Sequence, residues 1–414
     1  MTSVAAGQGV PDGNGQAASG NDGASRDEVS WRDPKRYAWM LGLVVPAIPF
    51  LIWLGYQSWE GTWAMHLVWW MAPIVVFGLI PLLDLIIGTD GENPPDELIE
   101  WLENDRYYRW ILYLFLPIQY AGLVLACWMW TTYDMTWFDR LGLAISVGVV
   151  AGIGINTAHE LGHKKVEYER WLARVALAQT FYGHFFIEHN RGHHVRVATP
   201  EDPASSRVGE SFYRFWPRTV SGSLRSAWAL EKKRLARSNR GPWTLRNDVL
   251  SAWLMSVVLY GALIAAFGWE VLPMLLIQAF FGFSLLEVVN YLEHYGLLRQ
   301  RTAKGGRYER PTARHSWNSN NVVTNVFLYH LQRHSDHHAN PTRRYQALRD
   351  YEEAPQLPAG YATMILLALI PPLWRKVMDK RLLAHYNGDI TKANIHPPKR
   401  DKVLARYGAK AASA

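Results

Sequence analysis

Histidine is the residue type in this sequence with the clearest capacity for chemistry. The chain has 15 histidines, and most of them are gathered in four short segments. Imidazole nitrogens bind zinc, copper, iron and nickel, so the segments predict a metal site without naming the metal. Nine histidines are the candidate ligands: His159, His163, His189, His193, His194, His294, His334, His337 and His338.

The spacing within these segments indicates how the rings could share ions. Side chains three or four residues apart lie on one face of a helix, so such rings can converge on one ion. Adjacent side chains point about 100° apart, so an adjacent pair can face two different ions. The sets of the first kind are His159/His163, His189/His193 and His334/His337/His338, and the adjacent pairs are His193-His194 and His337-His338.

The number of donors predicts two ions, because one ion takes about six ligands at most. Two divalent ions held by neutral rings leave positive charge that carboxylates can offset. A ligating imidazole also commonly donates its second N–H group to a carboxylate. Four carboxylates beside the histidines are predicted to play these supporting parts: Glu160, Glu188, Glu293 and Asp336.

The composition indicates a membrane protein. Hydrophobic residues make up 49% of the chain, which includes 20 tryptophans, yet the mean hydropathy is only −0.11. Long apolar runs therefore alternate with charged stretches, as in a membrane protein with a large water-facing portion. The single cysteine, Cys127, excludes a disulfide within the chain and argues against a thiolate metal site. The formal charge of +7 is modest and no nucleic-acid motif is present, so no nucleic-acid partner is expected.

Six segments are long and apolar enough to span a bilayer: 37–56, 63–87, 111–130, 141–158, 249–269 and 271–291. Lysine and arginine are absent from the loops 57–62 and 131–138 but abundant between the fourth and fifth segments and near the C-terminus. Because cytoplasmic loops are rich in lysine and arginine, both termini and all the histidine segments are predicted to be cytoplasmic. A further run, 361–374, is interrupted by Pro371 and Pro372 and should lie on the membrane surface or pack against the cytoplasmic portion.

The predicted fold is therefore an all-α integral membrane protein with six transmembrane helices and a helical cytoplasmic portion that carries the histidine segments. Residues 1–30 are rich in small and polar residues and are predicted to be a disordered tail. The remaining parts are transmembrane helices 1–4 (31–158), a cytoplasmic segment with the first two histidine motifs (159–248), transmembrane helices 5 and 6 (249–291), a cytoplasmic C-terminal segment with the last motifs (292–407) and a flexible tail (408–414).

Together the motifs resemble those of a known family. His159–Lys164, Glu188–His194 and Leu331–His338 are similar to the three histidine boxes of the membrane fatty acid desaturase and hydroxylase superfamily. The segment Asn290–Gly296 resembles a mark of the alkane 1-monooxygenase branch. The resemblance implies a multi-pass protein of the bacterial inner membrane with two irons bound by the nine histidines. It also implies O₂ as co-substrate, hydroxylation of the terminal methyl of linear alkanes, and electrons from rubredoxin.

The expected substrate and electron donor lead to three further expectations. An alkane has no polar group, so an apolar channel between the spans, entered from lipid and closed at the metals, should position it. Rubredoxin binds iron through four cysteines, so it is expected on a separate chain or beyond Ala414. Lys164, Arg191 and Arg196 flank the histidines and are expected to attract an acidic carrier, an attraction that high salt should weaken.

Three other interpretations remain open. His159–His163 also matches the H-E-x-x-H motif of zinc proteases, with Glu160 as general base, but that interpretation leaves the other seven histidines unexplained. A fatty-acid desaturase or hydroxylase of the same superfamily would share the fold and the metal chemistry. A metal transporter would need histidines or carboxylates along the membrane interior, and the six predicted spans contain few.

Overall fold

The computed structural model describes residues 31–303 and 305–408. The predicted tail 1–30 and nearly all of the tail 408–414 lie outside the described residues. The chain divides into two compact units, Met1–Asp33 and Pro34–Ala414, and the helices of the described residues all lie in the second. Its described residues are helical, and their β-pairing is limited to isolated bridges. This confirms the predicted all-α class.

Five helices of the described chain are long and apolar enough to cross a membrane. Polar side chains fix the start of three of them, because each accepts a hydrogen bond from a first-turn amide: Asp105, Thr136 and Asn247. The five are η1 (Ala38–Leu43) continued by α1 (Val44–Trp59), α6 (Arg106–Thr132), α7 (Trp137–Gly162), α12 (Asp248–Phe267), and η5 (Trp269–Val271) continued by α13 (Leu272–Glu293).

The predicted span 63–87 is broken, so the expected count of six transmembrane helices is not confirmed. It is divided into α2 (Met65–Val68), α3 (Met71–Ile74), the π-helical turn η2 (Val75–Leu79) and α4 (Ile80–Ile87). The apolar helix that remains, Met71–Ile87, is shorter than the other five. Pro81 has no amide hydrogen to bond to the Phe77 carbonyl, so the regular turn is lost there and a wide turn lies directly before it.

Helix α7 forms the centre of the bundle. Of its spanning window 89% is buried, against 28% for α12. Glycines bring α13 close to it: a Cβ on Gly148 would lie 2.9 Å from the Phe281 Cβ, and one on Gly152 would lie 3.0 Å from the Gly282 carbonyl oxygen. Small residues allow helix backbones to approach each other in this way. The close packing holds together two helices that carry histidine motifs at their ends.

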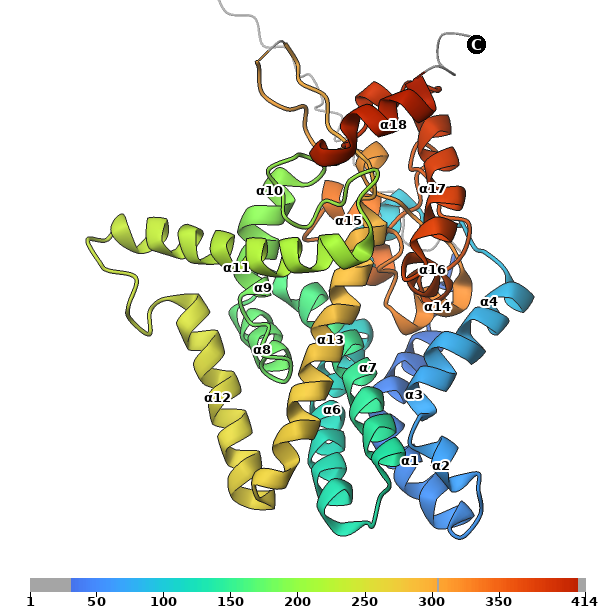
Figure 1. Cartoon of the computed structure of the whole chain (residues 1–414), viewed down its shortest axis with the longest axis vertical. Coiled ribbons are helices and arrows are strands. Elements are labelled where there is room, and N and C mark those ends of the chain that lie inside the picture. Colours follow the sequence, from blue (N-terminus) through green and yellow to red (C-terminus); the bar gives the residue numbers. More distant parts are fainter. Residues whose placement is uncertain (1–30, 304, 409–414) are drawn as a thin grey trace, which may run out of the picture. The chain divides into compact units, whose positions relative to one another are not determined.

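The remaining helices build the polar portion, in which α11 runs crosswise to α12 and α13 (Figure 1). The run 361–374 divides at its prolines into two helices, since Pro371 suits the first position of a helix but not the interior. The elements are η3 (Asp96–Leu98), α5 (Ile99–Asn104), α8 (Glu167–Ala178), α9 (Phe185–Glu188), the π-helical turn η4 (His189–His193), α10 (His194–Arg196), α11 (Phe212–Ala236), η6 (Ala313–His315), α14 (Val322–Phe327), α15 (His334–Ala339), η7 (Tyr345–Ala347), α16 (Tyr361–Ala368), α17 (Pro371–His385), η8 (Ile390–Lys392), η9 (Pro397–Lys399) and α18 (Arg400–Tyr407).

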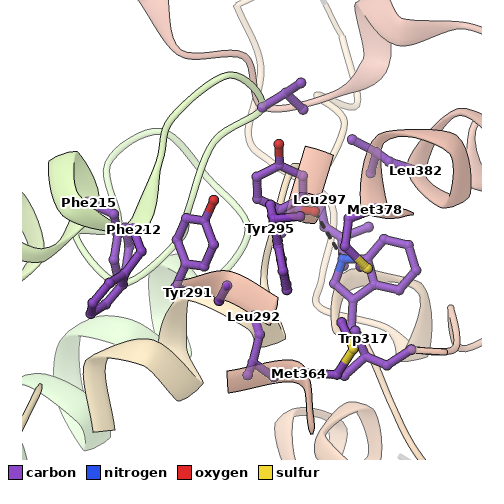
Figure 2. Close-up of a cluster of buried hydrophobic side chains, with 14 of the residues drawn as sticks. Phe212, Phe215, Tyr291, Leu292, Tyr295, Leu297, Trp317, Met364, Met378 and Leu382 are labelled. Atoms are coloured by element: carbon purple, nitrogen blue, oxygen red, sulfur yellow. Dashed lines mark hydrogen bonds between the residues drawn. The ribbon is translucent and has the colours of Figure 1, made fainter. Parts of the chain in front are cut away.

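A buried aromatic cluster joins the end of α13 to the C-terminal helices (Figure 2). The rings of Tyr291 and Tyr295 lie 5.2 and 5.3 Å from the ring of Trp374, measured between centroids. The indole N–H of Trp317 donates to the Tyr295 carbonyl oxygen over 3.0 Å. Because His294 lies between these two tyrosines in the chain, the cluster fixes the backbone that carries this histidine. Trp374 belongs to the run 361–374, so this run packs against the end of α13, which agrees with one of its two predicted positions.

Candidate metal centre

The structure gathers the nine candidate histidines into two groups. Within each group the donor atoms, one from each side chain, all lie within 4.8 Å of one another. The five-histidine cluster contains His159, His163, His189, His194 and His337, and the four-histidine cluster contains His193, His294, His334 and His338. Residues from separate stretches of the chain, 159–194, 294 and 334–338, therefore meet in one place.

Two helices place their histidines as the spacing predicts. His159 and His163 stand one turn apart at the end of α7, with ring centroids 5.0 Å apart, and both belong to the five-histidine cluster. His334 and His338 stand one turn apart on α15, with their Nε2 atoms 3.0 Å apart in the four-histidine cluster. His337 points to the other cluster, so its predicted convergence with His334 is wrong. On these two α-helices, histidines four residues apart belong to the same cluster, whereas His334 and His337, which are three residues apart, do not.

The predicted pairing of His189 with His193 is also wrong, because these residues form the π-helical turn η4. The His194 amide bonds to the His189 carbonyl five residues back, so His194 stacks over His189. Their Nε2 atoms lie 3.0 Å apart, while His193 turns into the four-histidine cluster. Gly192 suits this turn, because a Cβ there would collide with the Glu188 carboxylate.

Both adjacent pairs are divided between the clusters, as the 100° offset predicts. His193 belongs to the four-histidine cluster and His194 to the five-histidine cluster. His338 and His337 are divided in the same way. Two short backbone segments therefore contribute to both clusters, which fixes the clusters next to each other.

The donor geometry fits a metal ion better than it fits hydrogen bonding. Nε2 atoms face one another at 3.0 Å between His334 and His338 and at 3.2 Å between His194 and His337. The buried His159 Nε2 has no hydrogen-bond partner among the described residues. Bonds between a metal and an imidazole nitrogen are about 2.0–2.1 Å long, so two such nitrogens at a right angle lie about 3 Å apart. The spacing of the rings therefore suits imidazoles arranged around an ion.

Burial favours the neutral form of eight of these nine rings. Burial, followed by repulsion from the neighbouring histidines, holds the pKa of His189 and His337 well below the ordinary value of 6.5. A neutral imidazole keeps a lone pair on one nitrogen, and this is the form that binds a metal. The clusters are therefore ready to bind a cation at neutral pH.

Asp202 is a site residue that the sequence analysis missed. Its Oδ2 lies 2.9 Å from His193 Nδ1, and the Ser205 hydroxyl donates to the same oxygen over 2.6 Å. Burial raises the pKa of Asp202, but the His193 ring and the Ser205 hydrogen bond lower it to about 2. The ionised carboxylate holds the proton of His193 on Nδ1 and leaves Nε2 free for a metal. Asp202 lies in an irregular loop nine residues beyond His193, so helical periodicity gave no signal for it.

Three of the four predicted supporting carboxylates have cationic partners instead of imidazoles. Within the part of the chain that the structure describes, none of the three forms a hydrogen bond to a clustered histidine. Hydrogen bonds between two charged groups are stronger than those from a neutral ring N–H, so each carboxylate pairs with a lysine or an arginine. The pairs are Glu160 with Lys164 at 2.8 Å, Glu188 with Arg196 at 2.5 Å and Asp336 with Arg343 at 2.8 Å.

The fourth carboxylate, Glu293, lies at the four-histidine cluster itself. Its Oε2 is 3.2 Å from His334 Nε2, the atom that also faces His294 and His338. Glu293 therefore stands on the side of the ring where a metal would bind, and not behind the ring as a supporting group would.

Two expectations about charged side chains change in the light of these pairs. The buried Glu160 also accepts the Tyr345 amide, so its carboxylate is not free to act as the base of a zinc protease. Lys164 is buried, so its expected place on an exposed docking surface is wrong. Arg191 and Arg196 are half-buried, and each pairs with a carboxylate, which reduces their attraction for an acidic carrier.

An apolar cavity has both clusters in its wall. His159 and His189 of one cluster and His334 of the other line it, together with Ile153 of α7 and Leu285 of α13. The divided helix 71–87 also lines the cavity. One apolar side chain of the π-helical turn η2 and one of α4 belong to the wall. The cavity thus runs from the metal-binding groups into the spanning helices.

Apart from the clustered histidines and Glu293, the polar side chains in the wall of this cavity form hydrogen bonds within the protein. Each therefore has less capacity to hold a polar ligand, and the cavity suits an apolar one. The bonds are Asn156 Nδ2 to the Leu328 carbonyl at 2.7 Å, Asn290 Nδ2 to Glu287 Oε2 at 3.1 Å, and the Thr324 hydroxyl to Asp84 Oδ2.

Comparison with known proteins agrees with this arrangement. Residues 135–368, which include all nine clustered histidines, match the family model described as fatty acid desaturase. An alkane 1-monooxygenase of Acinetobacter baylyi is 51% identical over 380 residues, which cover 91% of this chain and 92% of that protein. The chain belongs to the alkane 1-monooxygenase family. Relatives of the same name from Pseudomonas putida (47% identical; 91% of this chain and 92% of that one) and Alcanivorax borkumensis (46%; 93% and 94%) support this assignment. As a member of this family the protein is an oxidoreductase.

Proposed function

We propose that the protein hydroxylates the terminal methyl of linear alkanes to primary alcohols, with O₂ as oxidant, two irons in the histidine clusters and rubredoxin as electron donor. The observation that carries the proposal is the apolar cavity with both imidazole clusters in its wall. The relatives are named alkane 1-monooxygenases, and this name favours hydroxylation over the desaturase alternative. We also propose that the clusters face the cytoplasm of a bacterial cell from its inner membrane.

In this proposal each cluster holds one iron. The five-histidine cluster offers imidazoles alone, and the four-histidine cluster adds Glu293 beside His334. When bound, the two irons would activate O₂ for insertion into a C–H bond, which acid–base groups alone cannot attack. Asp202 keeps the His193 proton away from the metal side of the ring.

The cavity would position the substrate by its shape. Ile153 and His159 both line the cavity and lie six residues apart on α7, which corresponds to about 9 Å along the helix axis. A linear chain lying along α7 would therefore bring one end to the imidazoles and leave the rest among apolar side chains. Such end-on positioning can select a terminal methyl without any polar contact.

The electron donor would approach at His194. This ring is partly exposed, and its neighbour Val195 has 65% of its surface accessible. An exposed apolar residue beside a partly exposed ligand suits the centre of a protein–protein contact. We propose that rubredoxin docks over Val195.

A reconstituted reaction tests the proposal. Purified protein is loaded with Fe(II) and supplied with rubredoxin, its NADH-dependent reductase, octane and ¹⁸O₂. The expected result is 1-octanol carrying one ¹⁸O atom, together with about two irons per chain by elemental analysis, as expected for a two-metal site. An alkene or an internal alcohol as the main product, or one zinc per chain, would contradict the proposal. Protein stripped of metal by a chelator is the control and should give no product.

A further inference from the structure

An open pocket lies between α8 and the start of α12, which are side by side in Figure 1. Helix α8 begins at Glu167, shortly after α7 ends at Gly162, and α12 begins at Asp248. Helices α7 and α12 are both of membrane-spanning length. The pocket therefore lies at the level where these two helices reach the face of the protein that carries the histidine clusters.

Two arginines in the pocket wall have guanidinium N–H groups that remain available to a ligand. Arg170 has no carboxylate partner among the described residues, and its guanidinium lies over the Phe186 ring at 5.7 Å. The Arg174 guanidinium is 3.7 Å from Asp248, too far for a hydrogen bond, and its buried Nε has no partner within the described chain. A guanidinium carries five N–H groups in a planar fork, so the pair offers many donors to an anion.

The acidic side chains of the pocket neutralise these arginines only in part, because Asp248 is shared among three arginines. Asp248 accepts a hydrogen bond of 3.2 Å from Arg191 and lies 3.9 Å from Arg234. Glu167 is exposed in the first turn of α8, where the helix dipole and water stabilise its charge. Arg191 and Arg234 also line a neighbouring pocket on α11 together with two further basic side chains. The local surface therefore attracts anions.

Two exposed aromatic side chains of α8 line the pocket. Tyr168 and Trp171 have 53% and 52% of their surface exposed. Tryptophan and tyrosine combine an apolar ring with a polar group, and they gather where a membrane meets water. The exposed rings indicate that the pocket opens at the height of lipid head groups.

We propose that this pocket binds the head-group phosphate of an anionic phospholipid in the surrounding leaflet. Arg170 and Arg174 donate to the phosphate oxygens, a geometry that the guanidinium fork matches well. Trp171 and Tyr168 pack against the glycerol and the upper part of the acyl chains. Basic pockets beside membrane-spanning helices are suited to anionic head groups. This inference does not depend on the proposed reaction.

A bound lipid would also support the metal centre from outside. Phe186 lines the lipid pocket, whereas its neighbour Phe185 lines the cavity and lies 4.8 Å from the His189 ring, measured between centroids. Both phenylalanines belong to the four-residue helix α9, which leads directly into the π-helical turn η4. Filling the pocket should therefore raise the thermal stability of the protein.

Lipid competition tests the proposal. The protein with its metals is purified in a neutral detergent and given equal amounts of dioleoyl phosphatidylglycerol and dioleoyl phosphatidylcholine. Native mass spectrometry should then show several-fold more bound phosphatidylglycerol, and only this lipid should raise the melting temperature. The double variant R170Q/R174Q should lose both effects. The control R307Q/R310Q removes two arginines that lie outside the pocket, and it should behave as the wild type.

Several outcomes would overturn the proposal. Equal binding of the two lipids by the wild type would do so, as would an unchanged preference in R170Q/R174Q. If millimolar inorganic phosphate displaces the phosphatidylglycerol and gives the same stabilisation, the site binds free phosphate and the lipid assignment fails. If the double variant does not fold, R170Q alone replaces it, because Arg170 has no ion pair to lose within the described chain. This single variant must also lower the preference.

Discussion

The two histidine clusters differ in what surrounds them. The five-histidine cluster consists of imidazoles without a hydrogen-bonded carboxylate in the described residues, and its member His194 is partly exposed. All members of the four-histidine cluster are buried, and Asp202 and Glu293 contact two of its rings. An ion in the four-histidine cluster would therefore have more of its charge offset, whereas an ion in the five-histidine cluster would lie closer to the surface. The difference indicates that one cluster is better placed to receive electrons and the other to stabilise a higher charge.

Removing one ring from each cluster should have the largest effect and should separate the two. His338→Ala leaves the four-histidine cluster with three rings, whereas His337→Ala leaves the five-histidine cluster with four. Alkane hydroxylation should fall to background in both variants. His338→Ala should lose more iron, about one equivalent per chain by elemental analysis, because three imidazoles and one carboxylate hold an ion less well than four imidazoles.

A suitable control is His66→Gln, since His66 pairs with Asp139 and belongs to neither cluster. It should keep the iron content of the wild type. Equal iron loss from the two cluster variants would mean that the clusters do not act as separate sites.

Changing the carboxylate beside His193 should have an intermediate effect. Asp202→Asn keeps the shape but removes the charge that holds the His193 proton on Nδ1. Loss of such a supporting group costs about 10–100-fold in metal affinity. A competitive chelator titration should therefore show one weakened iron and one unchanged iron.

Glu210→Gln is the matched control for Asp202→Asn. Glu210 is equally buried but pairs with Arg218, away from the rings. Its substitution can lower the melting temperature and should leave the affinity for both irons unchanged. If this variant weakens iron binding as much as Asp202→Asn, the effect is one of stability and not of support to His193.

The smallest effect should come from the surface beside the five-histidine cluster. Val195→Asp places a negative charge next to His194, where the electron donor is proposed to dock. Reduction by rubredoxin should slow about tenfold, since a like charge at a contact slows association with an acidic carrier. Reduction by dithionite should not change, because this small reductant needs no docking surface.

The control for Val195→Asp places the same charge elsewhere. Ala405 is exposed on α18, and Ala405→Asp should leave both reductants as effective as in the wild type. If reduction by rubredoxin slows equally in the two variants, the cause is the net charge of the protein. Docking at Val195 would then lose its support.

Much of the metal centre could be predicted from the sequence, because ligand chemistry depends on residue type and local spacing. Nine imidazoles in four segments identified every histidine of the clusters. The helical offset of adjacent residues predicted that His193 and His194, and also His337 and His338, would face different groups. Hydrophobic run lengths located the five helices that are long and apolar enough to span a membrane for a similar reason, since a bilayer fixes the length of apolar chain that crosses it.

Only the tertiary structure decided the rest. Whether residues 189–193 form an α-helix or a π-helical turn depends on the packing around Gly192, and this choice moved the partner of His189 from His193 to His194. The contacts of Asp202, the position of Glu293 and the cationic partners of Glu160, Glu188 and Asp336 likewise depend on side chains brought together by folding. Local periodicity determines which residues share a helix face, but it carries no information about the neighbour that each side chain meets in the folded protein.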